Sequence, residues 1–535
     1  MGIERYRLIA SATALSVSLT SLPVVGQSDC TPSERRIEFR TTDNVRIRGA
    51  ITAPCHASDT DLLPTIIFLN PLGQSHTTYR PQAQAFATDG YRVLSFDPRG
   101  WKSSGGSTTL IYPDLVKDVQ HAIDWLTAHY ATGRIGMTGI SEGGAMSLLT
   151  AAADSRVSAV ASLSGWTNIV HPSVGNTPRL AWNLVIGALL FAFGRPLDLI
   201  KEAIGHAWHG TNPEPLDVLE ASSPWFHLDE MNQKQTPLLL IHEMDDTLFP
   251  INQTVDFYEK LAGPKHLQIN RGFHAASSIT VLQYRDKEPW ASVHEWFDAY
   301  VRDERPSNLD GRVRISFKNS DKILGLKDDF RDDARVDTFY LQQTSHGYQL
   351  NDTVMESLTP TDLTIVNSPW NPARVSTGIP VRSALKNLTD LQTVAVPIKE
   401  LKRPYAIQFS SAPYSDGATV LGIPKLRLKL ATQTKKGLVI AHLVDIGPDE
   451  VGQLITHGTH TWSDGDIAGD GSYQFEIEMY FTAWTLAPGH RLGVVLNGAD
   501  FEYQPPTLWR YNYKLDQSNG NLKLDVPLTP LRSAE

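Results

Sequence analysis

The 535-residue sequence predicts an α/β domain with an inserted helical cap, followed by an all-β sandwich domain. Apolar strands alternate with helical segments from residue 35 to about residue 304, which is typical of βαβ units and a mainly parallel sheet. After residue 311, short alternating segments are separated by Gly, Asp, Asn and Pro turns, which is typical of a sandwich. The length also favours more than one domain, because it exceeds what one hydrophobic core usually supports.

Residues 1–26 have the pattern of a secretory signal peptide. Arg5 and Arg7 precede a weakly apolar stretch, and small residues around Gly26 form a plausible cleavage site. The alternative is an N-terminal anchor helix, which Pro23 and the many serines and threonines disfavour. We therefore expect a secreted or periplasmic protein.

The cysteine count and the charge restrict the classes of site and partner. The only two cysteines, Cys30 and Cys55, could form one disulfide between the N-terminal segment and the first hairpin in an oxidising compartment. Without a Cys-x-x-Cys pair, we expect no metal site of the zinc or redox kind. The net charge is −10 and no basic block occurs, so we expect no nucleic-acid partner and no anionic membrane surface.

The strands and helices of the first domain follow one another in a regular order. Residues 37–54 alternate as a hairpin does, and Gly90 closes the first predicted helix. The predicted buried strands are 65–70, 91–97, 134–141, 158–165 and 236–243, and the predicted helices are 82–90 and 112–129.

Residues 166–235 interrupt this order and are predicted to form the cap. The apolar run at 180–194 is short for a bilayer span, so we interpret it as a helix over the site and expect no membrane span in the mature chain. Trp166, Trp182 and Trp208 could line a substrate pocket, although aromatic residues more often simply pack in a core.

A Gly-x-Ser-x-Gly match places Ser141 between two glycines. The match alone is weak, and a tight turn is the simpler explanation. However, an apolar strand precedes it and a helix of small residues follows, which is the strand–turn–helix arrangement that presents a nucleophile. The backbone amide of Glu142 would then point to the place where an oxyanion forms. A second oxyanion donor is expected from Leu72 or Gly73, unless that loop is only a turn.

A serine nucleophile needs a base and an orienting acid, which follow it in the order acid then histidine in such folds. Two aspartates, Asp245 and Asp246, follow the strand at 236–243. The usual acid loop places a proline four residues after the acid, so Pro250 indicates Asp246 and not Asp245. We expect Asp245 to be a solvated turn residue. His274 lies 28 residues after Asp246, directly after a predicted strand, and is the general base that the order predicts.

With these residues in view, the chain resembles the cocaine-esterase and X-Pro dipeptidyl-peptidase-like serine hydrolases. The likeness lies in the motifs "FDPRGWKSSGG", "YPDLVKDVQHAIDWL" and "DDTLFP", and in later segments such as "LAPGHRLGVVLNGADF". It implies an α/β-hydrolase catalytic domain at 30–304, a C-terminal jelly-roll (galactose-binding-like) domain at 311–535 and the triad Ser141, Asp246 and His274. It also implies an acyl-enzyme route on esters or amides of small substrates, without a cofactor.

The chain departs from the family's pattern beside the nucleophile. The family often has a tyrosine in the oxyanion loop and another after the nucleophile, where this chain has Leu72 and Glu142. Glu142 could favour cationic substrates or face solvent. The dipeptidyl peptidases' additional N-terminal domain is absent, which favours an esterase or acylase over an X-Pro dipeptidyl aminopeptidase. A non-catalytic binding protein that uses the sandwich domain is the alternative from another class. The sequence does not indicate an oligomeric state.

Overall fold

The computed structural model describes residues 30–108, 114–170, 216–246, 248–303, 307–327, 335–345, 347–355, 363–367, 375, 394–396, 398–401, 403–500, 502–503, 505–507 and 509–530. The chain divides into two units at Thr31 and Pro32, and the elements below belong to the second unit, Pro32–Glu535. The predicted signal peptide lies outside the described residues. Within them, no helix is long and apolar enough to cross a membrane.

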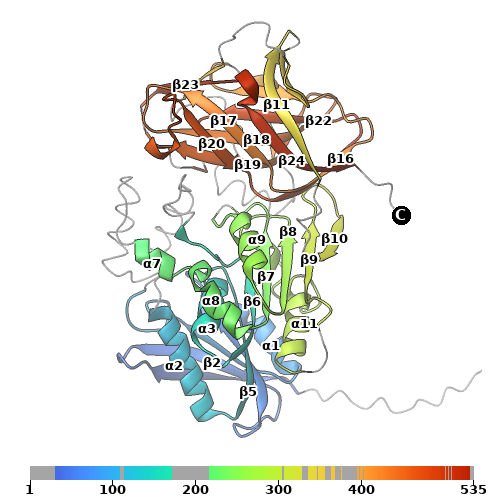
Figure 1. The fold of residues 1–535 in the computed structure, drawn as a ribbon. Coiled ribbons are helices and arrows are strands. Elements are labelled where there is room, and N and C mark those ends of the chain that lie inside the picture. Colours follow the sequence, from blue (N-terminus) through green and yellow to red (C-terminus); the bar gives the residue numbers. More distant parts are fainter. Residues whose placement is uncertain are drawn as a thin grey trace, which may run out of the picture. The chain divides into compact units, whose positions relative to one another are not determined.

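A ten-stranded sheet forms the centre of the first domain, with the strand order β1-β2-β4-β3-β5-β6-β7-β8-β9-β10 (Figure 1). Strands β4 to β9 run parallel along this order, and antiparallel pairs flank them at both edges. The strands are β1 (Ser33–Arg40), β2 (Arg46–Ala53), β3 (Leu63–Leu69), β4 (Arg92–Asp97), β5 (Thr132–Ile140), β6 (Val157–Leu163), β7 (Leu238–Glu243), β8 (Lys265–Asn270), β9 (Arg312–Ser316) and β10 (Ile323–Lys327).

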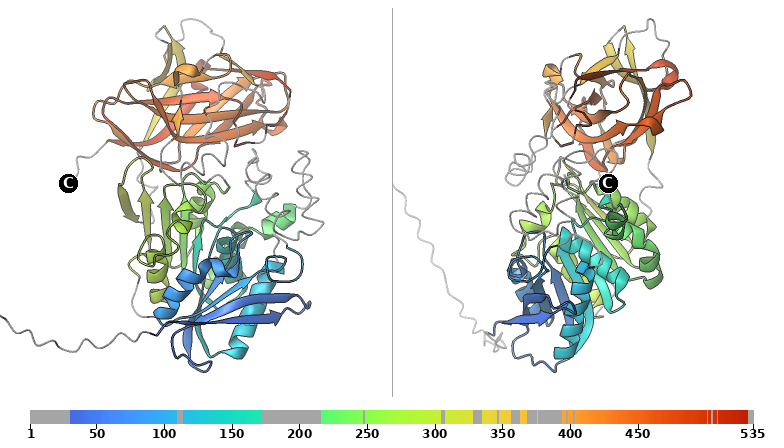
Figure 2. Two further views of the ribbon diagram at one scale, coloured as in Figure 1. Left: turned by 180° about the vertical axis from the view of Figure 1, so that it is seen from behind. Right: turned by 90° about the vertical axis from the view of Figure 1, so that its left-hand side faces the viewer.

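Helices cover both faces of this sheet, as the two further views in Figure 2 show. On β3, Ile66 and Phe68 join one apolar cluster with α1 and α11, while Ile67 and Leu69 join another with α2, α3 and α9. Alternate side chains of a strand point to opposite faces, so a strand covered on both sides must be apolar throughout. The helices are α1 (Arg80–Thr88), α2 (Asp114–His129), α3 (Glu142–Ala153), α7 (Leu216–Ala221), α8 (Leu228–Lys234), α9 (Ile251–Lys260), α10 (Ala276–Ile279) and α11 (Trp290–Tyr300).

The first sheet continues beyond the boundary predicted near residues 304–311. Strand β9 pairs in parallel with β8, and β10 pairs with β9, although the sequence analysis assigned both segments to the sandwich. Short alternating strands look alike in either domain, so only the pairing partner assigns them.

The predicted cap is described only in part. After Trp166 and its neighbours, the described portion consists of α7, a 3₁₀ turn at Pro224–His227 and α8. The helix predicted at 180–194 and two of the pocket tryptophans, Trp182 and Trp208, lie outside the described residues.

The second domain is all-β, as predicted. Its strands form a sheet with the order β13-β23-β17-β24-β11-β12-β15-β22-β18-β19-β14, while β16 pairs with β21 and β24, and β20 pairs with β17. The strands are β11 (Val336–Thr344), β12 (Gly347–Asn351), β13 (Thr364–Asn367), β14 (Ala395–Val396), β15 (Ile407–Ser410), β16 (Ala418–Gly422), β17 (Lys425–Ala431), β18 (Gly437–Ile446), β19 (Gly452–Trp462), β20 (Tyr473–Glu478), β21 (Thr482–Leu486), β22 (Arg491–Asn497), β23 (Tyr511–Leu515) and β24 (Lys523–Pro530). Strand β17 alternates buried leucines with partly or fully exposed charged residues, which is typical of a sheet with one face in the core.

Candidate active site

Ser141 lies at the turn between β5 and α3, with a backbone φ of 59°. A positive φ is uncommon for a residue with a side chain and is maintained only where the surrounding structure enforces it. Here the Ser141 amide donates to the carbonyl of Leu163 on β6 (2.8 Å), and its own carbonyl accepts from Gly144 (3.0 Å) and Ala145 (3.1 Å). The turn therefore raises the serine at the carboxyl end of the parallel strands.

The two motif glycines are required by close packing against β3. A Cβ atom at Gly139 would lie 2.4 Å from the carbonyl oxygen of Leu69, and one at Gly143 would lie 1.9 Å from the same oxygen. The first turn of α3 thus contacts the end of β3 directly. The start of α3, which carries the Glu142 amide, therefore lies against Leu69 and Asn70, the residues that lead into the loop of Leu72 and Gly73.

His274 connects the serine to the acid predicted from the loop after β7. Its Nε2 lies 2.9 Å from the Oγ of Ser141, and its Nδ1 lies 2.7 Å from Oδ2 of Asp246. An imidazole between a serine hydroxyl and a carboxylate can accept the hydroxyl proton while the carboxylate stabilises the resulting charge. The structure thus brings all three predicted residues into one hydrogen-bonded chain.

Backbone hydrogen bonds hold the acid loop and the histidine loop together. Met244 donates to the carbonyl of Asn270 (2.9 Å), and Asp245 donates to the carbonyl of Gly272 (3.0 Å). These bonds extend the parallel pairing of β7 and β8, so the two loops leave adjacent strand ends in a fixed register. The separation of 28 residues in the sequence therefore becomes a hydrogen-bond distance.

The Asp246 carboxylate is buried but well supplied with donors. Its Oδ1 accepts from the amides of Leu248 and Phe249, both at 2.8 Å. Burial opposes its ionisation, but the charge of His274 and the hydrogen bonds of His242 and His274 outweigh burial and hold the pKa of Asp246 well below its ordinary value. The acid is therefore ionised at neutral pH.

Asp245 differs from the solvated turn residue that we expected. Its Oδ1 lies 2.5 Å from the Nζ of Lys318, whose side chain is only 7% exposed. The Asp245 side chain itself is 41% exposed. It thus pairs with an almost buried lysine that follows β9, a contact that no local pattern in the sequence indicates.

The loop between β3 and α1 is held by Asp97, at the end of β4. The Asp97 carboxylate accepts from the backbone amide of His76 (2.6 Å) and from the hydroxyl of Ser103 (2.6 Å). Within the loop, Gln74 donates to the carbonyl of Pro71 (3.0 Å), and Gly73 has a φ of 75°. The loop is therefore a true turn, which does not exclude an oxyanion role for its amides.

Glu142 is the first residue of α3, and its side chain does not face solvent. The residue is 3% exposed, and its Oε1 has no hydrogen-bond partner among the residues that the structure describes. Burial raises the pKa of Glu142 to about 8, so the carboxyl is mostly protonated at neutral pH. Its backbone amide, like the first amides of any helix, has no acceptor within the helix.

An apolar cluster lies beside the triad and includes one of the predicted pocket tryptophans. Trp166 is 2% exposed, and its ring lies 5.3 Å from the ring of Phe249, which in turn lies 5.2 Å from the ring of His274. Trp101 belongs to the same cluster but was not predicted. It stands in the "FDPRGWKSSGG" motif, which was the signal available in the sequence. Within the described part of the chain, its indole Nε1 has no hydrogen-bond partner.

Cys30 and Cys55 are both disulfide-bonded. No free cysteine occurs in the described part of the chain.

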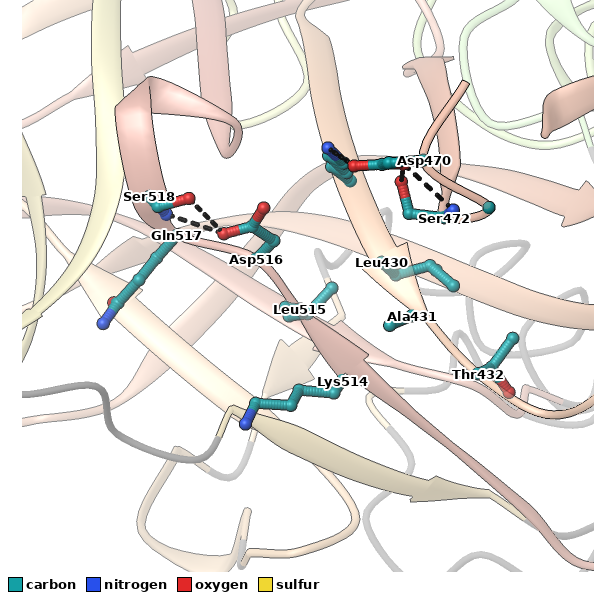
Figure 3. Close-up of a pocket in the computed structure, with 12 residues that line it drawn as sticks. Leu430, Ala431, Thr432, Asp470, Ser472, Lys514, Leu515, Asp516, Gln517 and Ser518 are labelled. Atoms are coloured by element: carbon teal, nitrogen blue, oxygen red, sulfur yellow. Dashed lines mark hydrogen bonds and ion pairs between the residues drawn. The ribbon is translucent and has the colours of Figure 1, made fainter. Parts of the chain in front are cut away.

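A separate groove on the second domain has a volume of about 570 Å³. Residues of β17, β23 and neighbouring loops line it (Figure 3). Asp470 accepts from the Nζ of Lys429 (2.5 Å) and the hydroxyl of Ser472 (2.6 Å), and Asp516 accepts from the hydroxyl of Ser518 (2.6 Å). Both carboxylates thus already have donors within the protein. The groove shares no residue with the serine site.

Two family models match the chain. Residues 43–189 match the X-Pro dipeptidyl-peptidase (S15 family) model, and residues 318–524 match the X-Pro dipeptidyl-peptidase C-terminal non-catalytic domain. Among curated proteins, the one named carbamate hydrolase RutD, from Rhizobium rhizogenes, is 23% identical over 255 residues, which are 43% of this chain and 94% of that protein.

Solved structures share the fold over nearly the whole chain. An aminopeptidase from a marine sediment Thaumarchaeota archaeon has a TM-score of 0.73 at 14% identity, covering 96% of this chain and 99% of its own. An α-amino acid ester hydrolase gives the same TM-score and identity, covering 96% of this chain and 100% of its own. A CocE/NonD family hydrolase from Staphylococcus aureus has a TM-score of 0.66 at 13% identity, covering 93% and 94%.

The order of the two matched domains and the architecture agree with the resemblance expected from the motifs. The chain belongs to the cocaine-esterase and X-Pro dipeptidyl-peptidase-like family of serine hydrolases, which act on ester or amide bonds.

Proposed function

We propose that the protein is an acyl esterase or acylase that forms an acyl-enzyme on Ser141. The observation that carries the proposal is the unbroken chain from the Ser141 hydroxyl through His274 to Asp246, with distances of 2.9 and 2.7 Å. In this proposal the Oγ of Ser141 attacks the substrate carbonyl carbon while the Nε2 of His274 takes the hydroxyl proton.

The proton then returns to the leaving group. The tetrahedral intermediate collapses, its bond to the leaving alcohol or amine breaks, and His274 donates its proton to that group. Water repeats the sequence on the acyl-serine, with His274 again as base, and releases the acid. Asp246 stays ionised throughout and holds the imidazole in the orientation that each step needs.

The oxyanion of each tetrahedral intermediate is assigned to backbone amides. The Glu142 amide opens α3 beside the loop of Leu72 and Gly73, so one amide from each side could donate to it. The apolar cluster of Trp166, Trp101 and Phe249 supports a small apolar group next to the reacting carbonyl.

The second candidate, an X-Pro dipeptidyl aminopeptidase, is favoured by the family model that residues 43–189 match. That activity needs an anionic group for the amine of the substrate. The buried Glu142, with its pKa of about 8, is mostly uncharged at neutral pH and is a poor candidate for this contact.

One assay separates the two. We expect release of p-nitrophenol from short acyl esters and little release of p-nitroaniline from Ala-Pro or Gly-Pro anilides. Ser141→Ala is expected to abolish both turnover and labelling by a fluorophosphonate probe, with Ser147→Ala, a serine inside α3, as the matched control. Turnover at the wild-type rate in Ser141→Ala would refute the triad, and a folded wild-type chain that stays unlabelled would favour a non-catalytic binding protein.

We also propose that the protein is exported. The disulfide-bonded state of Cys30 and Cys55 supports this proposal, because disulfides persist mainly in oxidising compartments. N-terminal sequencing of the protein from a periplasmic or secreted fraction should begin near residue 27. Recovery only from the cytoplasm with residues 1–26 intact would contradict it.

A further inference from the structure

A second histidine contacts the acid of the proposed triad. His242 lies on β7, four residues before Asp246, and is fully buried. Its Nε2 lies 3.2 Å from Oδ2 of Asp246, the same oxygen that lies 2.7 Å from Nδ1 of His274. One carboxylate oxygen is therefore shared by two imidazoles.

The neighbours of His242 determine which of its nitrogens carries hydrogen. Nε2 faces two acceptors, Asp246 Oδ2 and the carbonyl of Phe249 (3.0 Å), so it must be the protonated nitrogen. Nδ1 lies 3.1 Å from the hydroxyl of Thr254, which is buried on α9. This hydroxyl can donate to a neutral ring or accept from a charged one, so Nε2 donates to the acid in both states.

The charged groups around His242 favour its contact with the acid. Burial lowers the pKa of His242, but the hydrogen bond and charge of Asp246 and the charge of Glu243 outweigh burial, so the pKa lies above its ordinary value. Glu243 is itself buried and accepts from the hydroxyls of Ser164 and Ser277, both at 2.6 Å. His274, on the other side of the acid, is the remaining titratable group of this chain of contacts.

We propose that His242 is a positioning residue for the hydrolysis, which holds Asp246 through its Nε2 hydrogen and limits how strongly Asp246 accepts from His274. The inference rests on the proposed triad. When two donors share one carboxylate oxygen, each forms a weaker hydrogen bond to it than it would form alone. Loss of the His242 donor should therefore make Asp246 a stronger acceptor toward His274. It should also leave the Asp246 carboxylate less restrained in position.

The matched variants are His242→Met, which removes the donor, and His242→Gln, whose amide nitrogen can take the place of Nε2. With a p-nitrophenyl ester, we expect His242→Met to lower kcat roughly 10- to 100-fold, since small displacements of catalytic groups cost this much. The acid limb of its kcat/KM profile should move to higher pH, while KM changes little. His242→Gln should restore most of kcat and the position of the limb.

A role in packing alone predicts a different result. If His242→Met and His242→Gln lose kcat equally, or if both keep the wild-type acid limb, the inference is wrong. If His242→Met does not fold, Thr254→Val decides, because it removes only the Nδ1 partner and should shift the limb the same way by a smaller amount. An unshifted limb in that variant would overturn the inference. Ser141→Ala separates the two proposals. If Ser141→Ala is inactive while His242→Met keeps the wild-type kcat and acid limb, the proposed triad stands and only the role of His242 is refuted.

Discussion

Replacing Glu142 by glutamine should stabilise the protein, and the gain should depend on pH. The carboxyl is buried, and its pKa is raised from 4.5 to about 8. A carboxyl with a higher pKa in the folded chain binds its proton more tightly when folded, so stability falls as pH rises from 4.5 to 8. Glutamine has the same size and no charge, and therefore removes this dependence.

The size of the effect follows from the two pKa values. Stability changes by about 1.4 kcal/mol per pH unit between them. The cost of Glu142 is therefore about 3 kcal/mol at pH 7 and about 4 kcal/mol at pH 8, and it vanishes near pH 4. The pH dependence of stability that Asp246 contributes has the opposite sign. Because the pKa of Asp246 is lowered in the folded chain, its contribution to stability is lost only as the pH drops below its pKa in the unfolded chain.

Urea unfolding followed by tryptophan fluorescence between pH 4 and pH 8 measures this difference. The midpoints of wild type and Glu142→Gln should coincide near pH 4 and diverge steadily above it. Glu230→Gln, on the exposed part of α8, is the control and should show no such divergence. Parallel midpoints for wild type and Glu142→Gln across the whole range would refute the reasoning.

Three further changes test the packing, the charge pairs and the disulfide. Gly143→Ala places a methyl group 1.9 Å from a backbone oxygen of β3 and should cost about 3 kcal/mol or more in chemical denaturation, together with esterase activity; wild-type stability would contradict this contact. Arg99→Met leaves the buried Asp118 carboxylate without its bidentate partner, whose two nitrogens lie 2.6 and 2.7 Å from it. The variant should lower the unfolding free energy by about 3–5 kcal/mol at pH 7 and by less at pH 4, where the lone carboxyl is protonated. An equal loss of unfolding free energy at pH 4 and pH 7 would exclude the charge as its cause. The double variant Cys30→Ser/Cys55→Ser should lower the unfolding free energy by about 3 kcal/mol, and dithiothreitol should lower it only in the wild type.

Local patterns in the sequence were enough to predict the turn between β5 and α3 at Ser141 and the fold class. The sequence signal for the turn at Ser141 lies within a few positions of it, namely an apolar strand, two glycines and a helix of small residues. The approach of an aspartate and a histidine to Ser141 could be predicted as well, because parallel strands end at one edge of the sheet and the loops that follow them meet there. Asp246 and His274 were therefore predictable from their positions after β7 and β8.

The sequence by itself determined the order of strands and helices, the two domain classes and the three residues that the structure joins by hydrogen bonds. Only the tertiary structure decided that Glu142 is buried, that Asp245 pairs with Lys318, that β9 and β10 extend the first sheet, and that His242 shares the oxygen of Asp246. The physical reason is the distance along the chain over which each kind of interaction acts. Strand and turn preferences arise between near neighbours in the chain, whereas burial and pairing are set by elements that approach only after folding.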